Sequence, residues 1–198
     1  MRRVLVLGTL CATPFAVGAG AARGESLEPG GREPAAPTAN RINLRLGGAT
    51  TDDTGRPTIC LDVRVIAGFG IESCGTGQAI LHNDPGREMA HFRATWAFFE
   101  RTTSHGVAKL RAGAGFAELQ VGVDHPGFKF GDPDARDRGS VAGPEAVVQG
   151  QWLVPLGAGV EAVASMTAGV AAFAGADKLV VPANPVQPFV SFEIGVGW

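Results

Sequence analysis

Apolar and polar residues alternate strictly along the C-terminal end of the chain, from Pro188 to Trp198. The positions between the apolar ones are serine, glutamate and glycine. Successive side chains of a strand point to opposite faces, so this period of two predicts a strand with one apolar face. The apolar positions are Val190, Phe192, Ile194, Val196 and Trp198.

Seven further segments alternate in the same way, and with the C-terminal segment they make eight expected strands. An even number of strands places both chain ends on the same side of an up-and-down sheet. The fold class we predict is all-β: an eight-stranded antiparallel up-and-down transmembrane β-barrel over residues 41–198. The expected strands before the last one cover residues 42–46, 59–65, 69–74, 90–98, 108–116, 146–154 and 160–170.

The connections between these strands alternate between short and long. Two of the short ones, 66–68 and 157–159, have three residues with glycine last, which is typical of a type I turn closed by a glycine bulge. The third lies around Ser104. Short turns at one end and long loops at the other are the pattern of an outer-membrane barrel. The expected long loops are residues 48–57, 75–88, 123–144 and 175–187.

The other face of the strands carries small residues, glycines and nine charged side chains, five basic and four acidic. These charges would cover the outside of a soluble barrel poorly. An eight-stranded barrel is just wide enough for side chains to fill it, so paired charges could plug its lumen. We therefore favour a membrane barrel over a soluble one. The expected lumen charges are Arg45, Asp62, Arg64, Glu72, Arg93, Lys109, Arg111, Glu161 and Glu193.

The N-terminus has the pattern of an export signal. Arg2 and Arg3 precede an apolar core, and Ala19-Gly20-Ala21 forms a small-residue cleavage site, so we expect a signal peptide over residues 1–21. Residues 22–40 are rich in Pro and Gly and poor in large apolar groups, which predicts a flexible linker. The sequence contains no run of eighteen apolar residues, so it predicts no transmembrane helix. The net charge of −2 and the lack of a basic tract argue against nucleic acid as a partner.

The alternating pattern and the terminal strand over residues 41–198 resemble the small eight-stranded barrels of the OmpA and OmpX type. The end of the chain resembles the closing strand of such barrels, which their assembly machinery recognises. The resemblance implies a monomer in the bacterial outer membrane, with outer-membrane lipid and the barrel-assembly machinery as partners. It implies a non-catalytic protein that is structural or presents extracellular loops. The assembly signal would be Phe192, Ile194, Val196 and Trp198.

Two other functions stay open at this stage. Some barrels of this size are lipid-modifying enzymes that use serine and histidine. His91 is expected in the lumen with Glu72 or Arg93 as its partner, and Ser104-His105 lies in a short turn. The two remaining histidines, His82 and His125, fall on outer loops whose nearest serine is Ser140. The other alternative is a secreted lipocalin-like barrel that binds an apolar ligand.

Two motifs hint at a cofactor or a metal, and we assign neither. Gly157-Ala158-Gly159, with Asp177 further on, mimics a dinucleotide fingerprint but is better explained as a hairpin turn. The aspartates of residues 132–137 suggest a calcium loop, but Arg136 occupies a ligand position and no bidentate glutamate follows at the required spacing. We expect no cofactor and no metal site.

Cys60 and Cys74 are the two cysteines that would remain after signal cleavage, and an exported protein meets an oxidising compartment. If residues 66–68 form a three-residue turn, Val65 pairs with Phe69, and counting back places Cys60 opposite Cys74. Directly opposed strand positions bring Cα atoms within the range that a disulfide accepts. We predict a disulfide that stabilises the fold by an amount in the lower part of ~2–4 kcal/mol.

Overall fold

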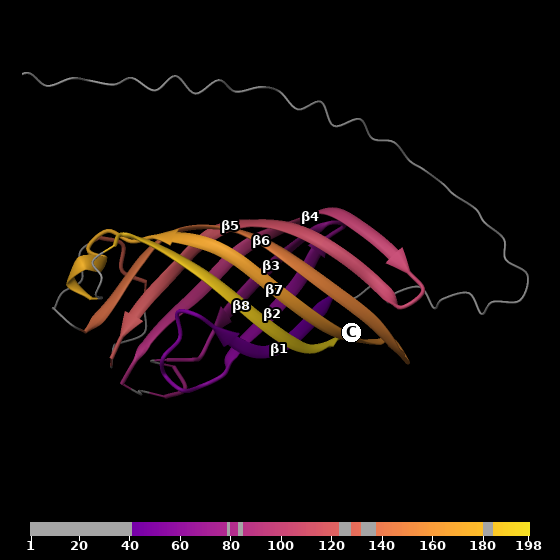
Figure 1. Ribbon diagram of the computed structural model, residues 1–198, viewed down its shortest axis with the longest axis horizontal. Coiled ribbons are helices and arrows are strands. Elements are labelled where there is room, and N and C mark those ends of the chain that lie inside the picture. The colour runs from indigo at the N-terminus through magenta and orange to yellow at the C-terminus, as the bar shows by residue number, and fades with distance from the viewer. Residues whose placement is uncertain (1–40, 79, 83–84, 123–127, 132–137, 180–183) are drawn as a thin grey trace, which may run out of the picture. The chain divides into compact units, whose positions relative to one another are not determined.

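The computed structural model describes residues 41–78, 80–82, 85–122, 128–131, 138–179 and 184–198. The predicted signal peptide, the linker, the 132–137 motif and His125 lie outside these residues. In the described part, eight antiparallel strands in up-and-down order close into a barrel, as predicted (Figure 1). The strands are β1 (Ile42–Ala49), β2 (Thr58–Ile66), β3 (Phe69–Gly75), β4 (Arg87–Thr103), β5 (Gly106–Val121), β6 (Gly139–Gly157), β7 (Val160–Ala172) and β8 (Val186–Gly197), with a short 3-10 helix η1 (Ala176–Lys178) before β8.

The barrel closes where β8 pairs with β1. Leu44 lies opposite Val196, and the Trp198 N–H donates to the Ile42 carbonyl over 3.0 Å. A Cβ on Gly195 would lie 2.0 Å from the Leu44 carbonyl oxygen, so only glycine lets the two strands approach this closely. The start of β1 and the end of β8 therefore lie at the same end of the barrel as the short hairpins. We call this end of the barrel the turn end. The opposite end, which carries the long connections, is the loop end (Figure 1).

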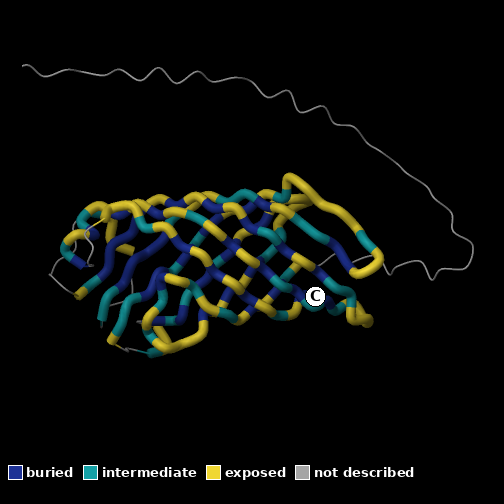
Figure 2. The backbone as a smooth tube through the Cα atoms, viewed as in Figure 1, coloured by how far each residue is buried: buried dark blue, intermediate teal, exposed yellow. Residues whose placement is uncertain are grey.

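Side chains alternate between the two faces of the barrel wall, and exposed and buried residues accordingly alternate along the strands (Figure 2). The outward face is the apolar one. Every strand contributes at least one large apolar side chain that is between 41% and 59% exposed. From β1 to β8, examples are Leu46, Leu61, Ile71, Trp96, Leu110, Val148, Met166 and Ile194. We call this outward surface the apolar belt.

Two of the short turns differ from the prediction. Phe69 pairs with Ile66 rather than with Val65, because the register shifts between Arg64 and Ile66. In the β6–β7 hairpin, Ala158 and Gly159 have φ angles of 52° and 79°, the pattern of a two-residue turn with both positions left-handed and not of a type I turn. This hairpin occupies the Gly157–Gly159 motif, so the hairpin interpretation of that motif is confirmed.

Every strand extends further than predicted at the loop end. β4 begins at Arg87, β5 extends to Val121 and β6 begins at Gly139, so parts of the expected loops 75–88 and 123–144 are strand. At these ends the inward face becomes apolar, and a buried cluster fills the barrel beneath η1. Its largest members are Met89, Leu119, Val141, Phe173, Leu179 and Phe189.

Candidate functional site: the charged lumen

The inward face of the strands gathers charged side chains inside the barrel. Arg45, Glu72, Glu161 and Glu193 are at most 1% exposed, and Asp62, Arg93 and Arg111 are also buried. The two other predicted lumen charges, Arg64 and Lys109, are only partly buried and line a small cavity at the turn end. Strand periodicity explains the set: each residue occupies an inward position on a strand whose outward neighbours belong to the apolar belt.

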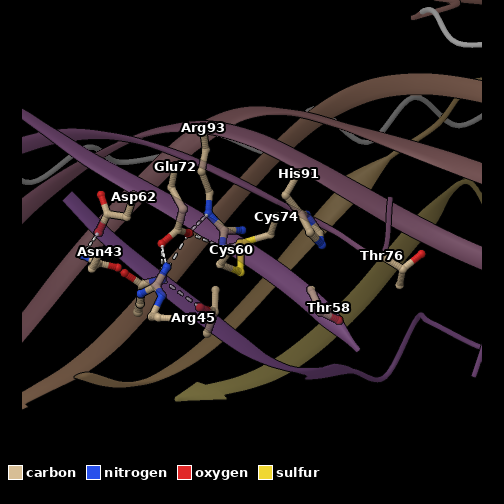
Figure 3. The surroundings of a disulfide bond; sticks show 12 residues. Asn43, Arg45, Thr58, Cys60, Asp62, Glu72, Cys74, Thr76, His91 and Arg93 are labelled. Carbon is tan, nitrogen blue, oxygen red and sulfur yellow. Dashed lines mark hydrogen bonds and ion pairs between the residues drawn. A yellow bond between two sulfur atoms is a disulfide. The ribbon is translucent and has the colours of Figure 1, made fainter. Parts of the chain in front are cut away.

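Glu72 of β3 is the centre of this network (Figure 3). Its carboxylate forms ion pairs with Arg45 of β1 and Arg93 of β4, and the Arg93 Nε donates to Glu72 Oε1 over 2.7 Å. From the opposite wall, the Gln149 side-chain amide of β6 donates to both carboxylate oxygens over 3.2 and 3.0 Å. One carboxylate thus connects four strands across the lumen.

A second group lies nearer the turn end. The Arg111 guanidinium of β5 contacts both carboxylate oxygens of Asp62 on β2, which lies across the lumen. The Asn43 amide donates to Asp62 over 3.1 Å, and Arg111 also donates to the side-chain oxygen of Gln149 over 3.0 Å and to the Thr95 hydroxyl. Gln149 therefore connects the Asp62 and Glu72 groups. Bidentate, charge-assisted contacts of this kind fix the geometry of both partners.

His91 points into the lumen, as expected, but its predicted partner was wrong. The imidazole Nδ1 lies 2.7 Å from Glu145 Oε2 on β6, and the ring packs against Phe189 with centroids 4.4 Å apart. Arg93 lies 3.7 Å from the same carboxylate and so joins the His91–Glu145 pair to the central network. Glu145 was missed because it directly follows the expected loop 123–144, although it continues the inward period of Gln149.

The predicted disulfide between Cys60 and Cys74 is present, with Cα atoms 4.1 Å apart (Figure 3). The predicted pairs near the bond are confirmed, because Leu61 pairs with Ser73 and Cys60 with Cys74, although the starting pair Val65–Phe69 does not form. Both cysteines are buried on the inward face, and Arg93 lies 3.9 Å from the Cys74 sulfur. The bond therefore belongs to the lumen and joins β2 to the short strand β3 beside the charged network.

The remaining candidate catalytic residues are dispersed over the described part of the chain. His82 Nε2 lies 2.9 Å from the Thr76 carbonyl oxygen, and Ser140 is buried on the outer face of β6. Ser104 Oγ lies 3.0 Å from His105 Nδ1, but both residues are exposed in the β4–β5 turn. Among the described residues, no three His, Cys, Asp or Glu side chains are grouped as metal ligands.

Comparison of the chain with protein-family models, with curated protein sequences and with solved structures found no match. Within the described residues, no helix has the length and apolar character needed to cross a membrane. The features that indicate a function are the barrel itself and the distribution of polar and apolar side chains over its two faces.

Proposed function

We propose that this chain is a non-catalytic β-barrel of the bacterial outer membrane, with a plugged lumen and loops presented at the cell surface. The observation that carries the proposal is the inverted polarity of the wall: apolar side chains point outward, and charged side chains point inward. A soluble barrel of this size has the opposite arrangement. Outward apolar and inward polar residues are typical of barrels that contact lipid.

The height of the apolar belt matches a membrane. In the stretches 146–154, 162–170 and 188–196, every outward position is apolar or glycine, and each stretch is nine residues long. A tilted strand needs about 9–11 residues to cross the hydrocarbon core of a bilayer. The belt therefore supports a barrel that spans the membrane once with each strand.

Aromatic side chains add a second argument, because they gather at both ends of the belt. Near the turn end, Trp96 packs with Phe69 and Phe98, with ring centroids 6.3 and 6.2 Å apart. Near the loop end, Phe92 and Phe116 both make edge contacts with Phe128, with centroids 4.9 Å apart. Two aromatic girdles at the membrane–water interfaces are a feature of outer-membrane barrels.

The lumen supports a plug rather than a pore. The charged network crosses the barrel at mid-height, and the apolar cluster fills it toward the loop end. The cavity at the turn end has a volume of about 80 Å³. This space is also small for the ligand of a lipocalin-like protein, since small-molecule sites usually occupy ~300–1,000 Å³.

Planar-bilayer recording of the refolded protein tests the plug directly. We expect little steady conductance, because Glu72, Asp62 and their arginine partners close the lumen. As a matched comparison, the Glu72→Ala/Arg93→Ala double variant removes one pair at the centre of the plug and should conduct more than the parent. Large, stable, ion-selective steps from the parent protein would contradict the proposal.

A further inference from the structure

A groove lies on the outer face of the barrel near the loop end, outside the lumen. It follows the outward side of β2 to β5 and has a volume of about 430 Å³, within the usual range for small-ligand sites. Ala90 and Phe92 of β4 line it, as do Leu81 of the β3–β4 connection and Phe128 of the β5–β6 connection. Leu81 is 72% exposed and Phe128 is 45% exposed, so these apolar walls lack a full cover from the described residues.

The groove crosses the level at which the outer face of the barrel changes polarity. Toward the middle of the barrel it is lined by Ile59 and Leu61, which belong to the apolar belt. Toward the loop end it is lined by Glu88, Glu118 and Gln120, which occupy outward positions but are at most 5% exposed. One end of the groove therefore continues the apolar belt, and the other is rich in hydrogen-bond acceptors.

Two of these acceptor residues have different hydrogen-bond environments. The Glu88 carboxylate accepts from the Thr76 N–H, the Thr76 hydroxyl and the Gln78 N–H, over 2.6, 2.6 and 3.0 Å. It is therefore satisfied by the loop that it holds in place. Gln120 is different: its buried side-chain oxygen accepts no hydrogen bond from any described residue. A buried acceptor without a donor costs about 1–3 kcal/mol, so a donor supplied by a ligand would be favourable.

We propose that this groove binds one phospholipid, with an acyl chain along the apolar end and an amine-bearing head at Gln120. The proposal rests on the proposed function, since it places the groove beside membrane lipid. An acyl chain fits because the apolar end is continuous with the belt. A head with N–H donors fits because the Gln120 oxygen lacks a donor and the adjacent carboxylates of Glu88 and Glu118 attract an ammonium group.

The test uses native mass spectrometry of protein released from vesicles that contain equal amounts of phosphatidylethanolamine and phosphatidylglycerol. We expect the parent protein to retain one phosphatidylethanolamine molecule. Ala90→Trp fills the floor of the groove and should reduce the retained lipid at least tenfold. Ala112→Trp is the matched control, because Ala112 is also a half-buried, outward alanine of the neighbouring strand β5 but does not line the groove.

A third variant, Gln120→Leu, tests the head group separately. It removes the acceptor but keeps the groove apolar, so a lipid should still be retained while the preference for phosphatidylethanolamine falls to parity. If Ala90→Trp retains as much lipid as the parent, or if Ala112→Trp loses as much lipid as Ala90→Trp, the groove is not the lipid site. A parent preference for phosphatidylglycerol, or an unchanged preference in Gln120→Leu, would overturn the assignment of the head.

Vesicle flotation of each variant distinguishes failure of this proposal from failure of the proposed function. If the variants float with the vesicles and Ala90→Trp still retains lipid, only the groove proposal fails. If the folded parent protein does not float, the membrane location fails and the lipid site fails with it. The heat-induced shift on a detergent gel verifies that each variant forms a closed barrel.

Discussion

At the scale of single residues, the lumen depends on one carboxylate more than on any other group. Glu72 is fully buried and has three arginines, Arg45, Arg93 and Arg111, within 4.0 Å. Burial of an ion pair is expensive, and loss of one partner leaves the other charge in place without compensation. The sequence indicated most of the charges that face the lumen, since periodicity determines the face. It could not indicate which charges pair, because the pairs join strands that are distant in sequence.

We predict that Glu72→Gln destabilises the barrel by about 3–5 kcal/mol, because Arg45 and Arg93 lose their shared counter-charge. Urea unfolding of the protein in detergent micelles measures this change. Glu100→Gln is the control: Glu100 pairs with Lys109 over 3.3 Å but its side chain is 53% exposed, so the expected loss is only about 0–1 kcal/mol. Equal effects of the two substitutions would contradict the central role of Glu72.

Asp52, in the connection between β1 and β2, gives a prediction about pH. Burial raises the pKa of its carboxyl above the ordinary value, although hydrogen bonds from Thr58 and the Met89 N–H partly oppose this. The folded state therefore binds the proton more tightly than the unfolded state does. The resulting stabilisation is fully present below the unfolded pKa and is lost as pH rises through the folded pKa.

The variant Asp52→Asn lacks this titration. Relative to the variant, the parent protein should become less stable as pH rises from the ordinary aspartate pKa through the raised pKa of folded Asp52, and the difference should then level off. Urea unfolding of both proteins across this pH range measures the difference. A difference that stays constant, or one that changes in favour of the parent as pH rises, would contradict the raised pKa of buried Asp52.

At the scale of elements, the strands were predicted well where they cross the belt and poorly at the loop end. There the two faces exchange polarity: Glu88, Glu118 and Gln120 point outward, whereas Met89 and Leu119 point inward. Because the predicted strands have an apolar outer face, their predicted boundaries at the loop end lie where this exchange begins, near Ala90, Phe116 and Ala146. The predicted register of β2 and β3 is correct at the cysteines although the predicted turn is wrong, because the irregularity between Arg64 and Ile66 offsets the shorter turn.

The last strand should matter for assembly. Trp198 is 52% exposed on the outer side of the seam between β8 and β1. We predict that Trp198→Ser slows assembly into the outer membrane, as followed by pulse-chase and the heat-induced gel shift. Trp152→Ser removes an aromatic from the same face of the internal strand β6 and should assemble at nearly the rate of the parent. If Trp198→Ser assembles as fast and as completely as the parent, the terminal residue is not an assembly signal.

At the scale of the whole molecule, the alternation of apolar and polar residues along the strands divides the barrel into an apolar outside and a charged inside. The sequence predicted this division, the eight-stranded antiparallel up-and-down barrel and the disulfide. It did not predict the apolar cluster under η1 or the outer groove, because both combine strand ends that lie beyond the predicted strands with residues of the long connections, whose course local patterns do not determine. From this division we propose that the outer face contacts the hydrocarbon of a membrane.

The three tryptophans of the chain test this claim directly. Trp96, Trp152 and Trp198 all point outward and are 50%, 39% and 52% exposed. In vesicles whose lipids carry bromine on their acyl chains, the folded protein should lose most of its tryptophan fluorescence compared with unbrominated vesicles. Water-soluble acrylamide should quench this fluorescence only weakly. A folded barrel that acrylamide quenches strongly and that brominated chains leave unquenched would contradict the account.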